Sequence, residues 1–442
     1  MAELVYDGER LVFTKEMQKE YTILMPMMLP MHFALLERIF NSSGLHVELL
    51  QSSSPQIVNE GLQNVHNDTC YPALLVIGQM MDAIKSGKYD LHKIALIITQ
   101  TGGGCRASNY IHLLRKALKR NGLEFIPVIS FNLLSMEKNP GFQLSLSTII
   151  QLAGAVAYGD MLTLLANQIR PYEVNPGQVD ALCTAWIDKL MERKMGMGHL
   201  KQNITEMIED FARVPINKTP KIRVGVVGEI YIKYAPLGNN NLEAFLRSEN
   251  CEVMVPGLMN FIIFMSDHHV VETKMFGVKH LKGAISGILK NICNRIQETC
   301  YGVLRQYPQF SCPMSFADLK ALVKGYVSYE NKMGEGWLLP AEMLELIEDG
   351  VDNIVCTQPF GCLPNHIVGK GMLRKIRENH PQANIVAIDY DPGATKINQE
   401  NRIKLMLAIA KQNQKNQKPQ SVVLPSPEMT KEKTAGEPVT AR

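Results

Sequence analysis

A buried strand, a glycine turn and an amphipathic helix follow one another over residues 93–118, and this order constrains the fold more than any other feature. Residues 93–99 are apolar and β-branched, which is typical of a buried strand. The turn QTGGGC follows at 100–105, and apolar residues then recur at helical spacing between Lys and Arg. The pattern predicts that Cys105 lies just beyond the carboxyl end of a strand, where open α/β sheets bind their ligands.

The position of Cys105 near a helix N-terminus favours thiolate chemistry. Backbone N–H groups and the helix dipole stabilise a thiolate, which is the form that binds metal or attacks a substrate. The turn is not a nucleotide-binding P-loop, because the Gly-Lys-Ser/Thr ending is missing. An ordinary glycine turn beside an incidental buried cysteine is the alternative interpretation.

The same alternation of strand and helix occurs on both sides of a helical stretch, which indicates two parallel sheets covered on both faces. Strands are expected at 21–26, 46–50, 93–99, 125–130, 222–229, 251–255, 354–356 and 385–389. We therefore expect an α/β protein with two lobes, 1–141 and 216–411, and an active cleft between them. Residues 142–215 are expected to form a helical connector that includes helices at 144–158 and 160–169, and residues 275–306 are expected to form one long helix with a break near Gly287. Residues 412–442 are rich in Lys, Gln, Pro, Thr and Glu, which predicts a disordered tail.

Composition limits the partners and the compartment. A net charge of +3 without a basic block argues against a nucleic-acid partner and against an anionic membrane surface. The longest apolar runs, such as 258–265, are too short to span a bilayer, and the N-terminus carries no secretory signal. We expect a cytoplasmic protein, in which the nine cysteines stay reduced. Metal binding or thiol reactivity is then a better explanation for them than disulfides.

Three cysteines occupy comparable positions, because Cys70, Cys105 and Cys362 each follow a turn and precede a helix. Such loops converge on a cleft between two α/β lobes, where three thiolates could hold an iron–sulfur cluster with one iron left open. Zinc bound by these three thiols and His366 is the competing hypothesis. Cys356 is at most an auxiliary ligand, because its apolar neighbours favour a buried strand thiol.

Other polar residues are weaker candidates. Glu229 ends a predicted strand and is a candidate for the cleft, whereas the carboxylates of 389–391 fit a ligand contact or an ordinary turn. The pair His268 and His269 is expected in a solvated loop. The remaining cysteines are expected mainly in the core, although the last two could join a larger cluster: Cys183, Cys251, Cys293, Cys300 and Cys312.

The cysteine motifs resemble those of the 2-hydroxyacyl-CoA dehydratase superfamily. They are CYP at 70–72, TQTGGGCRASNY at 99–110 and QPFGCLPNH at 358–366, supported by the segment 389–402. More narrowly, the chain is similar over 21–407 to the segment that follows the ATPase domains in the very large dehydratase-activator-like proteins. The resemblance implies two Rossmann-like lobes with a cysteine-ligated iron–sulfur cluster between them. Cys70, Cys105 and Cys362 fit its ligands. A 4Fe–4S cluster is the expected type, and a related branch holds a double-cubane cluster.

The resemblance also implies a reaction and a partner. In the dehydratases, a separate ATP-hydrolysing iron–sulfur activator injects one low-potential electron, and the resulting ketyl radical anion of the acyl-CoA thioester expels its hydroxyl group. This chain would then be an iron–sulfur component of a dehydratase (lyase) or related reductase of anaerobic metabolism, with a related second subunit as a candidate partner. A non-catalytic electron-transfer or assembly component is one alternative. The others are a double-cubane small-molecule reductase and a zinc-stabilised binding protein.

Overall fold

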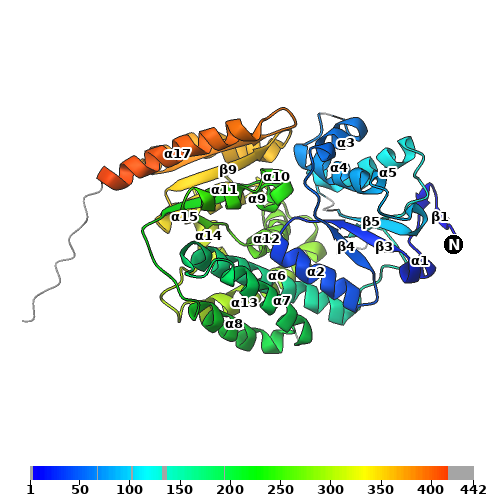
Figure 1. The fold of residues 1–442 in the computed structure, drawn as a ribbon, viewed down its shortest axis with the longest axis horizontal. Coiled ribbons are helices and arrows are strands. Elements are labelled where there is room, and N and C mark those ends of the chain that lie inside the picture. Colours follow the sequence, from blue (N-terminus) through cyan, green and yellow to red (C-terminus); the bar gives the residue numbers. More distant parts are fainter. Residues whose placement is uncertain (1–2, 67, 101–102, 132–136, 194, 417–442) are drawn as a thin grey trace, which may run out of the picture.

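The computed structural model describes residues 3–66, 68–100, 103–131, 137–193 and 195–416 as two α/β lobes packed on a layer of helices (Figure 1). Each lobe contains one four-stranded, fully parallel sheet. The first sheet has the order β4-β3-β5-β6, with strands Val47–Leu50, Thr22–Pro26, Ile94–Thr99 and Val128–Phe131. The second has the order β10-β9-β7-β8, with strands Asn384–Tyr390, Asn353–Pro359, Ile222–Gly228 and Cys251–Met254.

Helices cover both sheets, as expected for parallel strands that are apolar on both faces. The first lobe contains α1 (Lys15–Glu20), α2 (Pro30–Ser42), α3 (Gln56–Asn64), α4 (Tyr71–Lys85) and α5 (Tyr110–Arg120), with a short antiparallel pair β1 (Tyr6–Asp7) and β2 (Arg10–Leu11). The second contains α9 (Ile230–Tyr234), α10 (Pro236–Asn239), α11 (Leu242–Ser248), α15 (Leu338–Glu348), α16 (Leu373–Asn379) and α17 (Lys396–Asn416). The α/β class with two Rossmann-like lobes is therefore confirmed.

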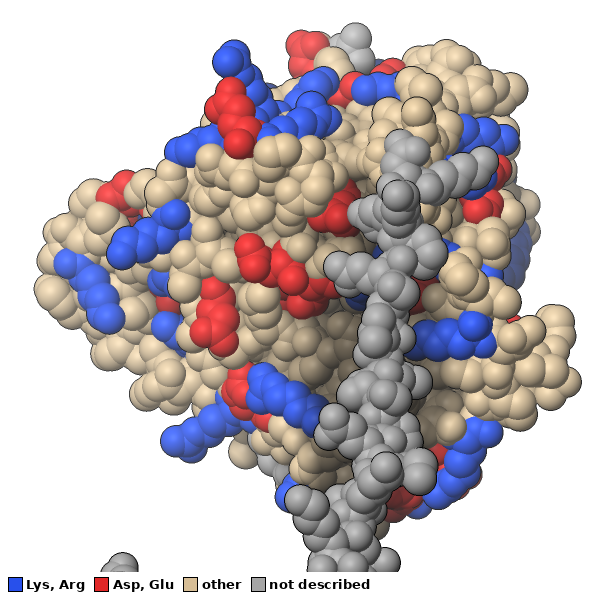
Figure 2. Space-filling model, turned by 90° about the vertical axis from the view of Figure 1, so that its left-hand side faces the viewer, with Lys and Arg blue, Asp and Glu red and all other residues tan. Residues whose placement is uncertain are grey.

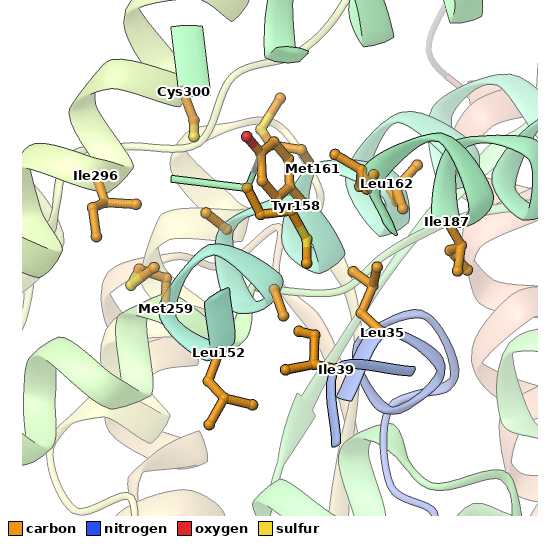
Figure 3. Packing of buried hydrophobic residues seen from close by; sticks show 14 of the residues in the cluster. Leu35, Ile39, Leu152, Tyr158, Met161, Leu162, Ile187, Met259, Ile296 and Cys300 are labelled. Carbon is orange, nitrogen blue, oxygen red and sulfur yellow. The ribbon is translucent and has the colours of Figure 1, made fainter. Parts of the chain in front are cut away.

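A helical layer joins the lobes and carries the largest part of the core. It consists of α6 (Leu146–Ile169), α7 (Gln178–Glu192), α8 (Met197–Ala212), α12 (Leu258–Phe276), α13 (His280–Leu304) and α14 (Phe316–Leu322). Side chains of α6 such as Tyr158 lie between those of α2, including Leu35, and those of α13, including Cys300 (Figure 3). The core is thus continuous from the first lobe into this layer.

Helix α6 corrects one expectation. The stretch Leu146–Tyr172 is long and apolar enough to cross a membrane by length and composition, although no unbroken apolar run had indicated it. Interspersed Gly, Ala, Ser and Thr keep the runs short while the average hydropathy stays high. Half of this window is buried, and α6 packs against α2 and α8, so it is a core helix of an α/β protein. The cytoplasmic location stays a prediction.

Two helix boundaries also differ from expectation. The segment expected as one helix over 275–306 is a hairpin, in which α12 ends before Gly277 and α13 starts at His280. Gly277 and Lys279 have φ of +64° and +55°, and this left-handed backbone turns the chain. Gly287, where a break was expected, lies inside α13. The predicted helices 144–158 and 160–169 form the single helix α6.

The domain limits and the tail stay predictions. Helix α17 continues to Asn416, and the rest of the segment expected to be disordered lies outside the described residues. On the face shown in Figure 2, acidic and basic side chains alternate rather than forming a field of one sign. This mixture agrees with the small net charge.

Candidate functional site

Cys70 lies at the contact between the two lobes. It immediately precedes α4, whose second residue is Pro72, a residue suited to a first helical turn because its missing N–H is not needed there. The Cys70 Sγ lies 2.8 Å from the Tyr110 hydroxyl, and the side chain is buried. The Tyr71 N–H donates to the carbonyl of Phe360 at 2.9 Å. This hydrogen bond ties the first lobe to the loop that carries Cys362.

Cys362 lies in the loop after β9, and this loop packs against Cys70. The neighbouring Gly361 has φ of +72°, and a Cβ placed there would approach the Cys70 Cα to 3.0 Å. Glycine is therefore required for the two loops to come this close. The side chain of Cys362 is buried, and its N–H donates to the carbonyl of Pro359 at 3.3 Å.

Cys105 precedes a 3-10 turn, Arg106–Asn109, that leads into α5. It is partly exposed, and its carbonyl accepts a 2.7 Å hydrogen bond from the Ser108 hydroxyl. Thr101 and Gly102 of the glycine turn lie outside the described residues. A Cβ on Gly104 would lie 2.4 Å from the Met333 Sδ, so the segment 331–337 of the second half packs directly on this turn.

The three thiols form one electrostatic group. Burial, followed by negative charge on Glu335, Glu229 and Cys70, raises the pKa of Cys105 to about 12. Burial, Glu335, Glu229 and Cys105 likewise raise the pKa of Cys362. Burial raises the pKa of Cys70, while the hydrogen bond with Tyr110 lowers it. Without a metal the thiols are therefore protonated at neutral pH, and metal binding must release their protons.

Two carboxyl groups complete the site. Glu229 follows β7 and accepts a hydrogen bond from the Ile232 N–H at 2.9 Å, while Glu335 accepts one from the Ile230 N–H at 2.9 Å. Burial and the charge of Glu335 raise the pKa of Glu229 to about 8. Burial also raises the pKa of Glu335. Because two adjacent carboxylates in a desolvated place resist double ionisation, the pair retains a proton near neutral pH.

Glu335 was missed in the sequence. Its only local signal is the pattern Gly334-Glu335-Gly336, whose glycines have φ of +59° and +49°. Such a glycine pair marks a tight turn, and nothing in it indicates that the enclosed carboxylate meets a cysteine more than two hundred residues away.

Cys356 has different neighbours. It lies in the middle of β9, within the apolar cluster of the second lobe, and its nearest polar contact is the Asn365 Oδ1 at 3.9 Å. Burial, followed by the negative charge of Asp389, raises the pKa of its thiol to about 12. The structure thus places the loops that carry Cys70, Cys105 and Cys362 beside one another and surrounds Cys356 with core residues, while the ligand assignments themselves stay predictions.

The described residues do not form the zinc site expected around His366. The His366 Nδ1 lies 2.5 Å from the Gln358 Nε2, and the side chain is exposed. Among the described residues, no group of three or more His, Cys, Asp or Glu side chains is close enough to hold a metal ion. Cysteine thiolates are the donor type that iron–sulfur clusters use. The residues fit an iron–sulfur cluster by donor type.

The remaining candidate residues take part in ordinary structural contacts. His268 and His269 lie on α12 with ring centroids 4.0 Å apart, so the expected solvated loop is wrong. Burial lowers the pKa of His268 to about 4. Asp391 accepts the N–H of Gly393 in a turn. All nine cysteines are free, and four are buried in the core as expected: Cys183, Cys251, Cys293 and Cys300.

Comparison with known proteins adds one similarity. Residues 22–91 match a protein family described as the CoA enzyme activase uncharacterised domain. The matched segment runs from β3 through α4, so it contains Cys70 and ends before Cys105 and Cys362. Its description agrees with the broader resemblance to the dehydratase and activator system. No curated protein matches the chain.

Proposed function

We propose that this chain is the iron–sulfur subunit of a 2-hydroxyacyl-CoA dehydratase-like or related reductase system, fed with low-potential electrons by a separate ATP-hydrolysing activator. The observation that supports the proposal is the packing of three cysteine-bearing loops against one another, together with two buried carboxyl groups, where the lobes meet. The family similarity of residues 22–91 supports the same system. The narrower relation to the segment beside the ATPase domains is part of this proposal.

Each residue of the site has a defined task in this proposal. Cys70, Cys105 and Cys362 would hold the cluster, which supplies one-electron chemistry at low potential when bound. Met333 packs on Gly104, next to Cys105. Glu229 and Glu335 hold a proton within the electrostatic reach of the thiols. A group that loses a hydroxyl needs a proton at that oxygen, and this pair would supply it.

Serine substitutions test the ligand set. Cys70→Ser, Cys105→Ser and Cys362→Ser should each lose most of the iron, the sulfide and the broad visible absorption of anaerobically prepared protein. Cys356→Ser should keep most of its iron, and Cys183→Ser, a buried core thiol, is the matched control. Full iron content in all three ligand variants would reject the assignment. Loss of iron from Cys356→Ser as large as from Cys105→Ser would make it a full ligand.

A non-catalytic electron-transfer component is the second candidate, and the low exposure of the site favours it. Cys70 and Cys362 are only 6% and 8% exposed, which leaves little room for a substrate in this conformation. The two candidates differ in turnover. With activator, ATP and reductant, a dehydratase subunit consumes a 2-hydroxyacyl-CoA, whereas an electron-transfer component only reoxidises in the presence of another acceptor protein.

A further inference from the structure

The hairpin formed by α12 and α13 exposes an unusual number of large apolar side chains. Eight of them are between 41% and 76% exposed: Met275, Phe276, Val278, Leu281, Ile285, Ile288, Leu289 and Ile292. We call them the hairpin patch. On α13, residues 281, 285, 288 and 292 follow helical spacing and form one narrow stripe along the helix. Contiguous exposed apolar surface of this kind marks an interaction site.

Three cations near the hairpin patch have no acidic partner among the described residues. Residues 273–297 contain five Lys or Arg and no Asp or Glu, although Glu272 and Glu298 flank this stretch. Lys279 and Lys290 pair with Glu272 and Asp267 of α12, at 2.9 and 2.8 Å. In the described part of the chain, no carboxylate lies within ion-pair distance of the other three cations, which border the patch: Lys274, Lys282 and Arg295.

The hairpin patch is tied to the thiol site by one short segment. The Lys332 Nζ lies 3.2 Å from a Glu272 carboxylate oxygen on α12. The next residue, Met333, packs on Gly104 beside Cys105, and Gly334 packs on Pro364 beside Cys362. Met333 is itself half exposed, as are Phe360, Leu363 and Ile367 around Cys362. Residues 332–334 thus link the hairpin patch to a second apolar surface that borders the thiols.

We propose that the hairpin patch docks the protein that delivers electrons to the thiol site, and that this partner presents an apolar helical surface bordered by carboxylates. The proposal rests on the proposed function, because it takes the thiol site as the electron acceptor. Docking beside residues 332–334 would hold donor and acceptor close together without a mobile carrier.

The charge pattern selects this occupant over two others. A second copy of the chain would bring the same uncompensated cations against one another, which opposes association. A membrane surface also attracts cations, but the narrow stripe on α13 resembles a helix-packing seam more than the broad apolar face of an interfacial helix. A protein with a complementary acidic border satisfies both the apolar and the charged part of the surface.

The test measures binding of the activator protein encoded in the same genome to the full chain by interferometry. The double variant Leu281→Glu/Ile288→Glu removes two highly exposed members of the patch and adds negative charge, so it should weaken binding at least tenfold. Leu405→Glu, at a comparably exposed position on α17, is the matched control and should bind like the wild type. Binding should also weaken as salt is raised, because it depends on charge complementarity.

Controls separate this proposal from the others. Thermal melting confirms that the double variant folds, and its iron content should equal that of the wild type. Equal affinity of wild type and double variant, or no binding by the wild type, would overturn the docking proposal while an intact cluster upholds the proposed function. If the wild type self-associates and the double variant does not, the patch belongs to a second copy of the chain. If the wild type floats with anionic vesicles and the double variant does not, the patch belongs to a membrane surface. A chain without iron that still binds through the patch would uphold docking and reject the cluster.

Discussion

At the scale of single residues, the site combines five acidic groups with little counter-charge. The nearest buried ammonium, that of Lys233, is held by both oxygens of Glu342 at 3.0 and 3.1 Å. Its charge lowers the pKa of Glu229 and of Glu335, but burial outweighs this effect and keeps the carboxyl groups and the thiols protonated more readily than in water. The number of protons bound at the site therefore affects the stability of the folded protein.

Glu229→Gln is expected to flatten the pH dependence of stability in the metal-free protein. The pKa of Glu229 is raised from 4.5 to about 8 in the folded state, so the native state binds more protons than the unfolded state between these values. Stability is then largest near pH 4.5 and falls as the pH rises toward 8, by up to about 1.4 kcal/mol per pH unit for one proton. Urea unfolding between about pH 5 and 8 should show a smaller loss for the variant.

Glu206→Gln provides the control for this experiment. Its hydrogen bond with Arg193 holds the pKa of Glu206 at about 2, so its ionisation does not change between pH 5 and 8. This variant should keep the wild-type slope over that range. Identical slopes for wild type and Glu229→Gln would mean that Glu229 is ionised throughout. Burial also raises the pKa of Glu345 to about 8, so this group accounts for any pH dependence of stability that remains in Glu229→Gln.

The position of the cysteines after strands could be predicted from sequence, whereas the place of Glu335 beside them could not. Cys105 and Cys362 each follow a strand whose apolar residues identify it, and the carboxyl ends of parallel strands meet at one edge of a sheet. Glu229 shares this signal because it follows β7 directly. Glu335 belongs to a loop whose position is set by packing against Gly104 and Pro364, and such long-range contacts leave no periodic pattern in the sequence.

At the scale of elements, the crossing of two helices at a pair of glycines positions Cys70. Helices α3 and α4 cross where Gly61 and Gly78 face each other, with a Cβ on Gly78 only 2.1 Å from the Ile57 carbonyl oxygen. This close approach fixes α4, and Cys70 precedes the first residue of that helix. The hairpin turn at Lys279 shows the opposite case, because a lysine in left-handed backbone is set by its surroundings and not by its own preference.

Gly78→Ala is expected to destabilise the protein by about 1–3 kcal/mol or more, because the backbone of α3 cannot move away from the new methyl group without losing core contacts. The melting temperature should fall by several degrees, and the iron content of anaerobically prepared protein should fall with it as Cys70 shifts. Gly302→Ala in α13 is the matched control, since nothing lies within 4 Å of its Cβ position. That variant should be neutral or stabilised by about 0.5–1 kcal/mol. An unchanged melting temperature for Gly78→Ala would show that the crossing can open.

At the scale of the whole molecule, the two sheets were predictable and their contact was not. Strand and helix periods identify each lobe, because the strands of both four-stranded sheets are apolar and covering helices such as α5 have one apolar face. The hydrogen bond from Tyr71 to Phe360 and the packing of Gly361 on Cys70 join the lobes at single loops, and these contacts depend on the assembled core. The site exists only in the complete fold, as a composite of three loops, the start of α9 and the segment 331–337.

The final prediction concerns the source of the electrons. A cluster in this site calls for a strongly reducing donor, and the glycine turn lacks the Lys-Ser/Thr ending of a phosphate-binding loop because Cys105 and Arg106 follow Gly104. The isolated chain should therefore give no heat of ATP binding in calorimetry, and with dithionite alone it should turn over an acyl-CoA at a negligible rate. Adding the activator with ATP should switch turnover on, while activator with a non-hydrolysable ATP analogue should not. Tight ATP binding by the isolated chain would contradict this assignment and return the turn at 100–105 to phosphate recognition.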